Sequence, residues 1–116
     1  MSHIDGFVIA APTANKDAFV RRAATADPYF TDLGAVRIVE CREDDVPDGA
    51  ITDFRRAVRA EEGESVVFSW IEWPDKAARD AGMARVMADP RMAGDGPMPF
   101  DGPRMIFGGF EMLVDA

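Results

Sequence analysis

Five polar side chains interrupt strand-like stretches that are otherwise apolar, and they are the first candidates for chemistry. They are Arg37, Glu40, Ser69, Glu72 and Glu111. A carboxyl group held in apolar surroundings has a raised pKa and can act as a general acid or base near neutral pH. We therefore take Glu72, Glu111 and Arg37 as catalytic candidates, with Glu72 or Glu111 as the acid–base group and Arg37 or Arg104 as an anion contact.

A cavity beside these groups would be lined by side chains from the last two apolar stretches. The expected lining residues are Trp70, Ser69, Met98, Phe107 and Gly109. Met98 lies on a long loop, and such loops often close over a site. The alternative is that each polar residue lies at a sheet edge or an interface, with its charge paired to a neighbour. Both interpretations stay open at this point.

The chain has one histidine, His3, and one cysteine, Cys41. A lone histidine near the terminus predicts a surface position and rules out a two-histidine metal site within one chain. It also makes serine–histidine or cysteine–histidine catalysis a poor hypothesis. Cys41 lies in an apolar stretch, which predicts a small buried hydrophobe. We therefore expect no metal ion and no cofactor.

Two loop segments resemble ligand-binding motifs superficially, and neither fits. In "DDVPDG", Asp44, Asp48 and Gly49 have the spacing of a calcium loop, but Val46 replaces a ligand and Arg55 replaces the bidentate glutamate. In "GDGPMPFDG", no lysine followed by serine or threonine comes after the glycines, as a phosphate loop requires. Both segments are expected to be turns.

Composition and charge limit the class of protein and its partners. The chain has 116 residues, 47% of them hydrophobic, and a net charge of -8. This length and composition predict a single globular domain, residues 1–116. Nucleic acids and anionic membranes are poor partners, because basic side chains dominate binding to phosphate groups. The N-terminus lacks the pattern of a signal peptide, so we expect a cytoplasmic protein.

Hydrophobic periodicity predicts strands and helices in alternating order. Strands are expected at 5–11, 36–42, 65–73 and 105–114, and helices at 16–26 and 75–88. Pro28 is expected to begin a separate turn that Gly34 ends. A short helix capped by Thr52 is expected near residues 53–60. The order predicts an α+β fold: a ferredoxin-like β-α-β-β-α-β sandwich with an antiparallel four-stranded sheet.

Both faces of the predicted sheet are apolar, although two main helices can cover only one of them. In the strand at 65–73, Val66, Phe68 and Trp70 alternate with Val67 and Ile71. The uncovered face predicts an interface, and two sheets packed about a twofold axis would bury it. We therefore expect a homodimer. Alanines at 77, 81, 84 and 88 are expected to form the stripe of the 75–88 helix that packs closely on the sheet.

Several long sequence blocks support a family resemblance. "RIVEC", "DVPDG", "TDFRRAV", "VVFSWIEWP", "ADPRM" and "MPFDGPRMIFGGFE" occur in this order. On these blocks the chain resembles the YbaA-like family of bacterial domains of unknown function (family 1428) over nearly its whole length. The resemblance implies a dimeric α+β barrel and supplies no catalytic residues.

Two functional hypotheses follow. In the first, the protein binds or transforms a small apolar or aromatic molecule in a barrel cavity. In the second, it is a non-enzymatic dimeric accessory or stress-response module with a filled interior and no ligand. The pair Gly108 and Gly109 in the last strand is expected to admit an aromatic ring or ease a bend. Close approach of a ligand to Gly109 is the alternative.

Overall fold

The computed structural model describes residues 1–93 and 98–116. The strands are β1 (His3–Pro12), β2 (Arg37–Arg42), β3 (Glu64–Trp73) and β4 (Ile106–Glu111). The helices are α1 (Lys16–Asp32), α2 (Phe54–Ala57) and α3 (Lys76–Ala88). Short 3-10 turns occupy Thr13–Asn15, Pro90–Ala93 and Gly102–Arg104. The predicted order of strands and helices is confirmed.

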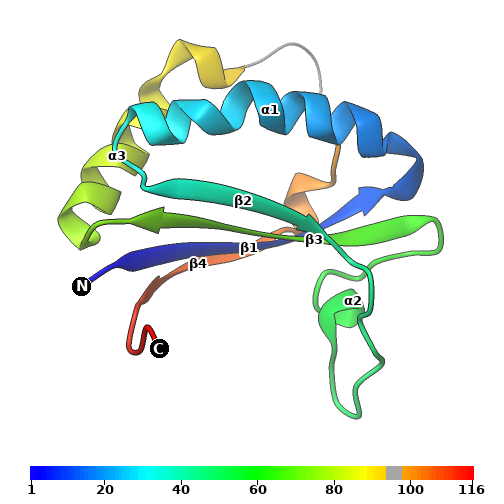
Figure 1. The fold of residues 1–116 in the computed structure, drawn as a ribbon. Helices are drawn as coiled ribbons and strands as arrows, with labels where there is room; N and C mark the ends of the chain where they lie inside the picture. The colour runs from blue at the N-terminus through cyan, green and yellow to red at the C-terminus, as the bar shows by residue number, and fades with distance from the viewer. Residues whose placement is uncertain (94–97) are drawn as a thin grey trace.

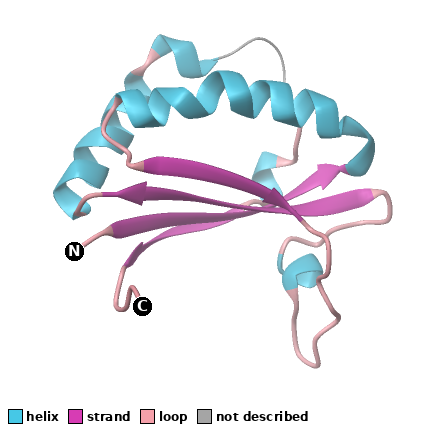
Figure 2. Ribbon diagram, in the orientation of Figure 1, coloured by secondary structure: helices cyan, strands magenta, loops and turns pink. Residues whose placement is uncertain are grey.

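The four strands form one antiparallel sheet in the order β2-β3-β1-β4. This is the ferredoxin-like arrangement that the sequence predicted. Figures 1 and 2 show α1 and α3 on one face of the sheet, with the other face free of both helices. Among the described residues, no helix combines the length and apolar character needed to cross a bilayer.

The register of the strands assigns each side chain to a face. Phe7 on β1 lies opposite Ser69 on β3 and Phe107 on β4. Alternation along β3 then puts Val67, Ser69 and Ile71 on the face beneath the helices, which we call the helix face. Phe68 and Trp70 lie on the other face, which we call the open face. These are the two sets that the sequence predicted for this strand.

The first helix is longer than predicted. The expected break before Pro28 is wrong, because α1 continues through this residue to Asp32. Proline removes one backbone hydrogen bond from a helix, and the carbonyl it leaves without a donor belongs to Ala24. Both residues are exposed, so water can satisfy that carbonyl. Gly34 follows the helix with a φ of 119°, a conformation that favours glycine.

The packing stripe of α3 also differs from the prediction. The four alanines expected to face the sheet are exposed, and the buried residues of α3 are Gly82 and Val86. A β-carbon at Gly82 would lie 2.2 Å from the ring of Trp73, which is completely buried. Alanine tolerates burial and exposure alike, so its spacing was a poor guide. The close contact of helix and sheet depends on one glycine instead.

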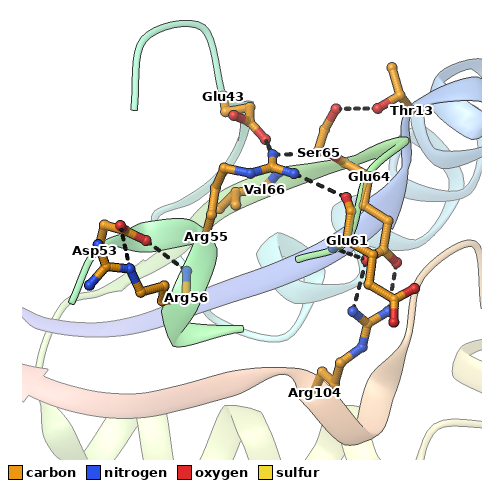
Figure 3. A network of polar contacts seen from close by, with 10 residues as sticks. All are labelled: Thr13, Glu43, Asp53, Arg55, Arg56, Glu61, Glu64, Ser65, Val66 and Arg104. Atoms are coloured by element: carbon orange, nitrogen blue, oxygen red, sulfur yellow. Dashed lines mark hydrogen bonds and ion pairs between the residues drawn. The ribbon is translucent and has the colours of Figure 1, made fainter. Parts of the chain in front are cut away.

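The connection between β2 and β3 extends on the side of the sheet opposite α1 (Figure 1) and is held by arginines (Figure 3). The predicted cap Thr52 is wrong: the Asp53 side chain accepts a hydrogen bond from the Arg56 amide at 2.7 Å and caps α2. Arg55 donates to Glu43 and to the carbonyl oxygens of Glu61 and Glu64. The connection therefore folds against the end of β3.

Arg104 joins this connection to the segment that leads into β4. Its guanidinium group contacts the Glu64 carboxylate at 2.6 and 2.8 Å (Figure 3). It also contacts the Asp101 carboxylate at 2.6 Å. The hydrogen bonds from Arg104, followed by one from the Glu61 backbone amide, hold the pKa of Glu64 down to about 2. Arg104 is thus engaged in a structural contact and is not available as the anion contact that the sequence suggested.

The prediction that Cys41 is buried is wrong. It is exposed at the edge strand β2, where it lies opposite Phe68 in the register. An edge strand has neighbours on one side only, so its side chains are covered less than those of a central strand. The apolar stretch identified the strand correctly but could not show that it lies at an edge.

Candidate functional site

A cavity of about 240 Å³ lies between α1 and the helix face of the sheet. Its lining is mostly apolar, with four polar members. The apolar members are Phe7, Ile9, Phe19, Ala23, Ala26, Phe30, Ile38, Ile71, Met87, Met92, Met98, Pro99, Phe100 and Met105. The polar members are Arg22, Asp27, Glu40 and Ser69. An apolar cavity with a few converging polar groups is the usual form of a small-molecule site.

The sequence of α1 explains why space remains beneath it. Its sheet-facing residues include Phe19, Ala23 and Phe30, spaced by four and seven residues along one side of the helix. The small side chains of Ala23 and Ala26 lie between the two phenylalanines. Large side chains therefore hold the helix off the sheet at both ends, and the alanines leave the middle unfilled.

Methionine and aromatic side chains close the cavity at the side away from β2. Met92 belongs to the 3-10 turn Pro90–Ala93, which is attached to α1 through Arg91. The Arg91 guanidinium lies 4.1 Å from the centre of the Tyr29 ring and 3.4 Å from the Asp32 carboxylate. Phe100 packs against Phe19 with ring centres 6.2 Å apart. This wall is adaptable, because methionine has several rotatable bonds.

The two acidic side chains of the cavity, which could transfer a proton, are Glu40 and Asp27. Glu40 is on β2, opposite Ser69 on β3, and Asp27 is on α1 above them. Burial, followed by the charge of Asp27, raises the pKa of Glu40 to about 8. Burial also raises the pKa of Asp27. The Ser69 side chain lowers the pKa of Glu40, but by less than burial and the charge of Asp27 raise it. One oxygen of Glu40, Oε2, is buried without a partner among the described residues.

Burial raises the pKa of both carboxyl groups, so the pair resists carrying two negative charges. The larger rise is at Glu40, where the charge of Asp27 adds to the effect of burial. Two carboxyl groups with raised pKa values can combine a base and a hydrogen-bond donor at one place. The Oε2 atom of Glu40 leaves one hydrogen-bonding position unfilled next to this cavity.

The catalytic candidates predicted from the sequence do not converge at this cavity. Glu72, Arg37 and Trp70 lie on the open face, where Arg37 Nε is 3.0 Å from Glu72 Oε1. Trp70 Nε1 donates to the same oxygen at 3.2 Å. These residues form a surface ion pair with an aromatic neighbour, which is the alternative interpretation given for them. Their strands were predicted correctly, but the register puts them on the opposite side from Glu40.

The remaining expected site residues are divided between three places. Ser69 and Met98 line the cavity beneath α1. Phe107 lies at the edge of the sheet, 71% exposed and stacked on Phe7 with ring centres 6.3 Å apart. Glu111 is exposed on β4 opposite His3, and Gly109 lies opposite Asp5. The lining expected from sequence therefore does not form one site.

The expectation that His3 lies at the surface is wrong. It lies in β1, is 9% exposed, and its Nε2 atom is buried without a hydrogen-bond partner among the described residues. Asp5, two residues on, accepts from Trp73 Nε1 at 2.9 Å and from Arg79 at 2.8 Å. Antiparallel pairing of the N-terminal strand with both β3 and β4 buries these side chains, and nearness to the terminus did not reveal it.

The glycine pair of β4 has two separate roles. Gly108 lies opposite Gly6 on the open face, and the ring of Phe110 covers both. In each case a β-carbon would lie 3.6 Å from that ring. The expectation that a glycine admits an aromatic ring is confirmed at Gly108. Gly109 faces the other way, where a β-carbon would lie 2.9 Å from Arg79 Nη2 and from His3 Nε2.

The open face carries a larger and shallower hollow of about 730 Å³. Its lining is almost wholly apolar: Ile4, Gly6, Phe7, Val8, Phe68, Trp70, Glu72, Ile106, Phe107, Gly108 and Phe110. Glu72 is the ionisable member and is already paired. We place the candidate site beneath α1 because it holds two ionisable carboxyl groups and Glu40 Oε2 has no hydrogen-bond partner among the described residues. Among the described residues, no cluster of three or more histidine, cysteine or acidic side chains could hold a metal ion.

Asp27 and Arg22 were missed at the sequence level. The expected helix ended at residue 26, one residue before Asp27, so the sheet-facing side of α1 was cut short. The sequence did indicate that Asp27 shares a helix face with Phe19 and Ala23, because the three residues follow one another at intervals of four. Arg22 lies three residues after Phe19 and four before Ala26, on the same side of the helix.

Comparison with known proteins identifies the family of this fold and site. Residues 2–102 match the family described as "Protein of unknown function (DUF1428)". The chain belongs to this family. A DUF1428 relative, the uncharacterized protein YbaA of Escherichia coli strain K12, is 59% identical over 116 residues and covers 99% of both chains. YbaA of Shigella flexneri matches to the same extent. The YbaA-like resemblance is confirmed.

Solved structures of another protein are similar in fold to this DUF1428 chain. Two crystal structures of SnoaB, a cofactor-independent oxygenase from Streptomyces nogalater, are similar to it. A variant of SnoaB has a TM-score of 0.53 and 18% identity, covering 98% of this chain and 95% of that one. A second SnoaB structure has a TM-score of 0.50 and 19% identity, covering 98% and 94%. At these identities the likeness concerns the fold.

Proposed function

We propose that this protein is a cytoplasmic homodimer that binds a small apolar or aromatic molecule beneath α1 and moves a proton with Glu40 and Asp27. The observation that carries the proposal is the pair of carboxyl groups in an otherwise apolar cavity. Buried polar groups without partners are costly, so such a pair is expected to have a function. A non-enzymatic module with a filled interior would not need the 240 Å³ of space.

The reaction class that fits is cofactor-free proton abstraction from a weakly acidic C–H or O–H group. The Asp27 carboxylate takes the proton, and the electron pair left behind moves onto the ligand oxygen as an enolate or phenolate. The protonated Glu40 donates a hydrogen bond to that oxygen and stabilises its charge. Return of the proton to a different atom completes an isomerisation, with no other reactant consumed. The fold shared with SnoaB, a cofactor-independent oxygenase, supports chemistry without a cofactor.

The homodimer is proposed from the open face. Phe68, Ile106 and Phe110 are 41%, 46% and 60% exposed there. Figure 2 shows this side of the sheet free of α1 and α3, with the β2–β3 connection projecting from one end. An apolar face of this kind is normally covered, and a second copy offers a matching surface. The dimer contact and the carboxyl pair then lie on opposite faces of the sheet.

The binding proposal is tested with calorimetry and ligand-observed NMR, using phenol and cyclohexanone as probes. We expect saturable binding to wild type and its loss in Ala26→Leu, which fills the cavity. Ala84→Leu, a matched change on the exposed side of α3, should bind as wild type does. Failure of both probes to saturate the wild type at millimolar concentration would overturn the binding proposal.

The catalytic part is tested by exchange of the α-hydrogens of cyclohexanone in D2O. Wild type should accelerate the exchange, and Asp27→Asn should abolish the acceleration while leaving cyclohexanone binding in place. Glu40→Gln keeps a hydrogen-bond donor and should retain part of the rate. Equal exchange rates with wild type, Asp27→Asn and no protein would contradict the assigned roles.

A further inference from the structure

The cavity has a second polar end, formed by Arg22, and this inference rests on the binding function proposed above. Arg22 is half-buried and is the positively charged member of the described lining. The arginines that the sequence suggested as anion contacts are engaged elsewhere. Arg37 is paired with Glu72, and Arg104 is paired with Glu64 and Asp101. Arg22 has no such ion pair among the described residues.

Helix geometry places Arg22 and Asp27 on opposite flanks of the sheet-facing side of α1. They are five residues apart, which corresponds to about 140° around the helix axis. A groove on the β2 side of α1 is lined by Asp27, Glu40 and Arg37, and Arg22 does not take part in it. Arg22 therefore lines the cavity on the flank of α1 away from β2. The Met92 and Phe100 wall is on that side.

The electrostatic data agree with this separation. The causes that shift the pKa values of Glu40 and Asp27 are burial, each other and Ser69, with no arginine among them. A guanidinium group in contact with either carboxyl would lower its pKa. The cavity thus has an acidic end at Glu40 and a cationic end at Arg22, with phenylalanine, isoleucine and methionine side chains between them.

We propose that Arg22 binds the anionic group of the ligand, and that the ligand is a small aromatic or alicyclic carboxylate with a hydroxyl or carbonyl group at its other end. The planar guanidinium fork matches a carboxylate, which it can bind through two parallel hydrogen bonds. The hydroxyl or carbonyl then reaches Glu40 and Asp27. At the packing density of protein interiors, 240 Å³ holds roughly a dozen non-hydrogen atoms. A single ring with two substituents is of this size.

The test compares two probes of one shape and different charge, 4-hydroxybenzoate and 4-hydroxybenzamide, by calorimetry at neutral pH. Wild type should bind the carboxylate more tightly than the amide by roughly tenfold. Arg22→Gln should remove this preference and leave amide binding unchanged. Arg21→Gln makes the same charge change on the exposed side of α1 and should keep the preference.

The outcomes separate this inference from the function on which it rests. If wild type and Arg22→Gln bind both probes equally well, the assignment of Arg22 is wrong and the cavity remains a binding site. If Arg21→Gln loses the preference as Arg22→Gln does, the effect is one of overall charge and the assignment is again wrong. If neither probe binds the wild type, and phenol and cyclohexanone also fail, the binding site itself is refuted.

Discussion

Glu40 on β2 and Asp27 on α1 bring two carboxyl groups together beneath the first helix, where burial raises the energetic cost of ionising both. Burial and the neighbouring charge raise the pKa of Glu40 to about 8, and burial raises that of Asp27. The free energy of unfolding should therefore depend on pH in a direction opposite to that of a normal acidic salt bridge.

The first prediction concerns this pH dependence. Between the ordinary value of 4.5 and about 8, folded Glu40 holds a proton that the unfolded chain has released. Stability should then fall as pH rises through this window and level off above it. Glu40→Gln cannot ionise, so its stability should fall less over the same range. Urea unfolding at a series of pH values measures the difference.

The control for Glu40 is Glu62→Gln, an exposed residue on the loop before β3. This variant should keep the wild-type slope of stability against pH. If Glu40→Gln and Glu62→Gln follow the wild type equally, the carboxyl of Glu40 titrates normally in the folded protein. The pair would then carry no shared proton at neutral pH.

The second prediction concerns the contact of α3 with the sheet. Gly82→Ala places a β-carbon 2.2 Å from the Trp73 ring and 3.0 Å from the Leu33 carbonyl oxygen. Helix propensity alone would favour alanine. The steric cost of a methyl group against the completely buried ring should exceed this gain. The free energy of unfolding should therefore fall by about 3 kcal/mol. Denaturant unfolding followed by tryptophan fluorescence gives the value.

Ala81→Ser tests the same helix at an exposed position and should change the free energy of unfolding by less than about 0.5 kcal/mol. A Gly82→Ala variant as stable as wild type would mean that α3 can move away from Trp73 at little cost. The close packing described for this helix would then be incorrect.

The third prediction concerns the open face. Phe110→Glu introduces a charge beside Phe68 and Trp70 at a side chain that is 60% exposed in one chain. The proposed dimer should separate into folded monomers, since burying an unpaired charge in an interface is costly. Light scattering should report the mass of two chains for wild type and of one chain for the variant.

Ala84→Glu adds the same charge to the exposed side of α3 and should remain dimeric. Circular dichroism should show the same secondary structure for both variants. A wild-type protein with the mass of one chain at micromolar concentration would refute the dimer. A dimeric Phe110→Glu variant would move the interface away from the open face.

The fourth prediction concerns the ion pair that joins the β2–β3 connection to β4. Arg104 holds the pKa of Glu64 at about 2, below its ordinary value of 4.5. Glu64 therefore contributes stability that is present above pH 4.5 and is lost as pH falls towards 2. Arg104→Gln should lower stability at neutral pH and make it less sensitive to acid. Urea midpoints from pH 2 to 7 test both effects.

For Arg104 the matched control is Arg42→Gln, an exposed arginine at the end of β2. It should keep the wild-type response to acid. If Arg104→Gln loses stability in acid as steeply as wild type, the pKa of Glu64 is set by something other than Arg104. The contacts of Glu64 with the 61–64 turn would be the next cause to examine.

The elements of this fold were accessible from sequence because their signals are local. Strand β3 is a continuous run of apolar and β-branched residues that Pro74 ends, and its two faces were assigned correctly. The ends of helices were less accessible. Pro28 predicted a break because proline removes a hydrogen bond, but solvent compensates when the helix flank is exposed. Thr52 and Asp53 are both capping residues, and only the backbone geometry selected Asp53.

The candidate site was less accessible because it depends on which side chains meet. Glu40 was visible as an acidic residue in an apolar strand, and so were Glu72 and Glu111. Their separation onto different faces and edges follows from strand order and register, which are long-range properties. Asp27 became part of the site only because α1 continues past Ala26 and crosses above β2.

The sequence by itself determined the family, the order of strands and helices, the apolar character of both sheet faces and the absence of a two-histidine metal site within one chain. Periodicity and composition carry these properties, and both are local. The tertiary structure decided that His3 is buried, that Gly82 and not an alanine stripe meets Trp73, and that Glu40, Asp27 and Ser69 come together. Those relationships join residues far apart in the chain, so only strand register and helix packing could establish them.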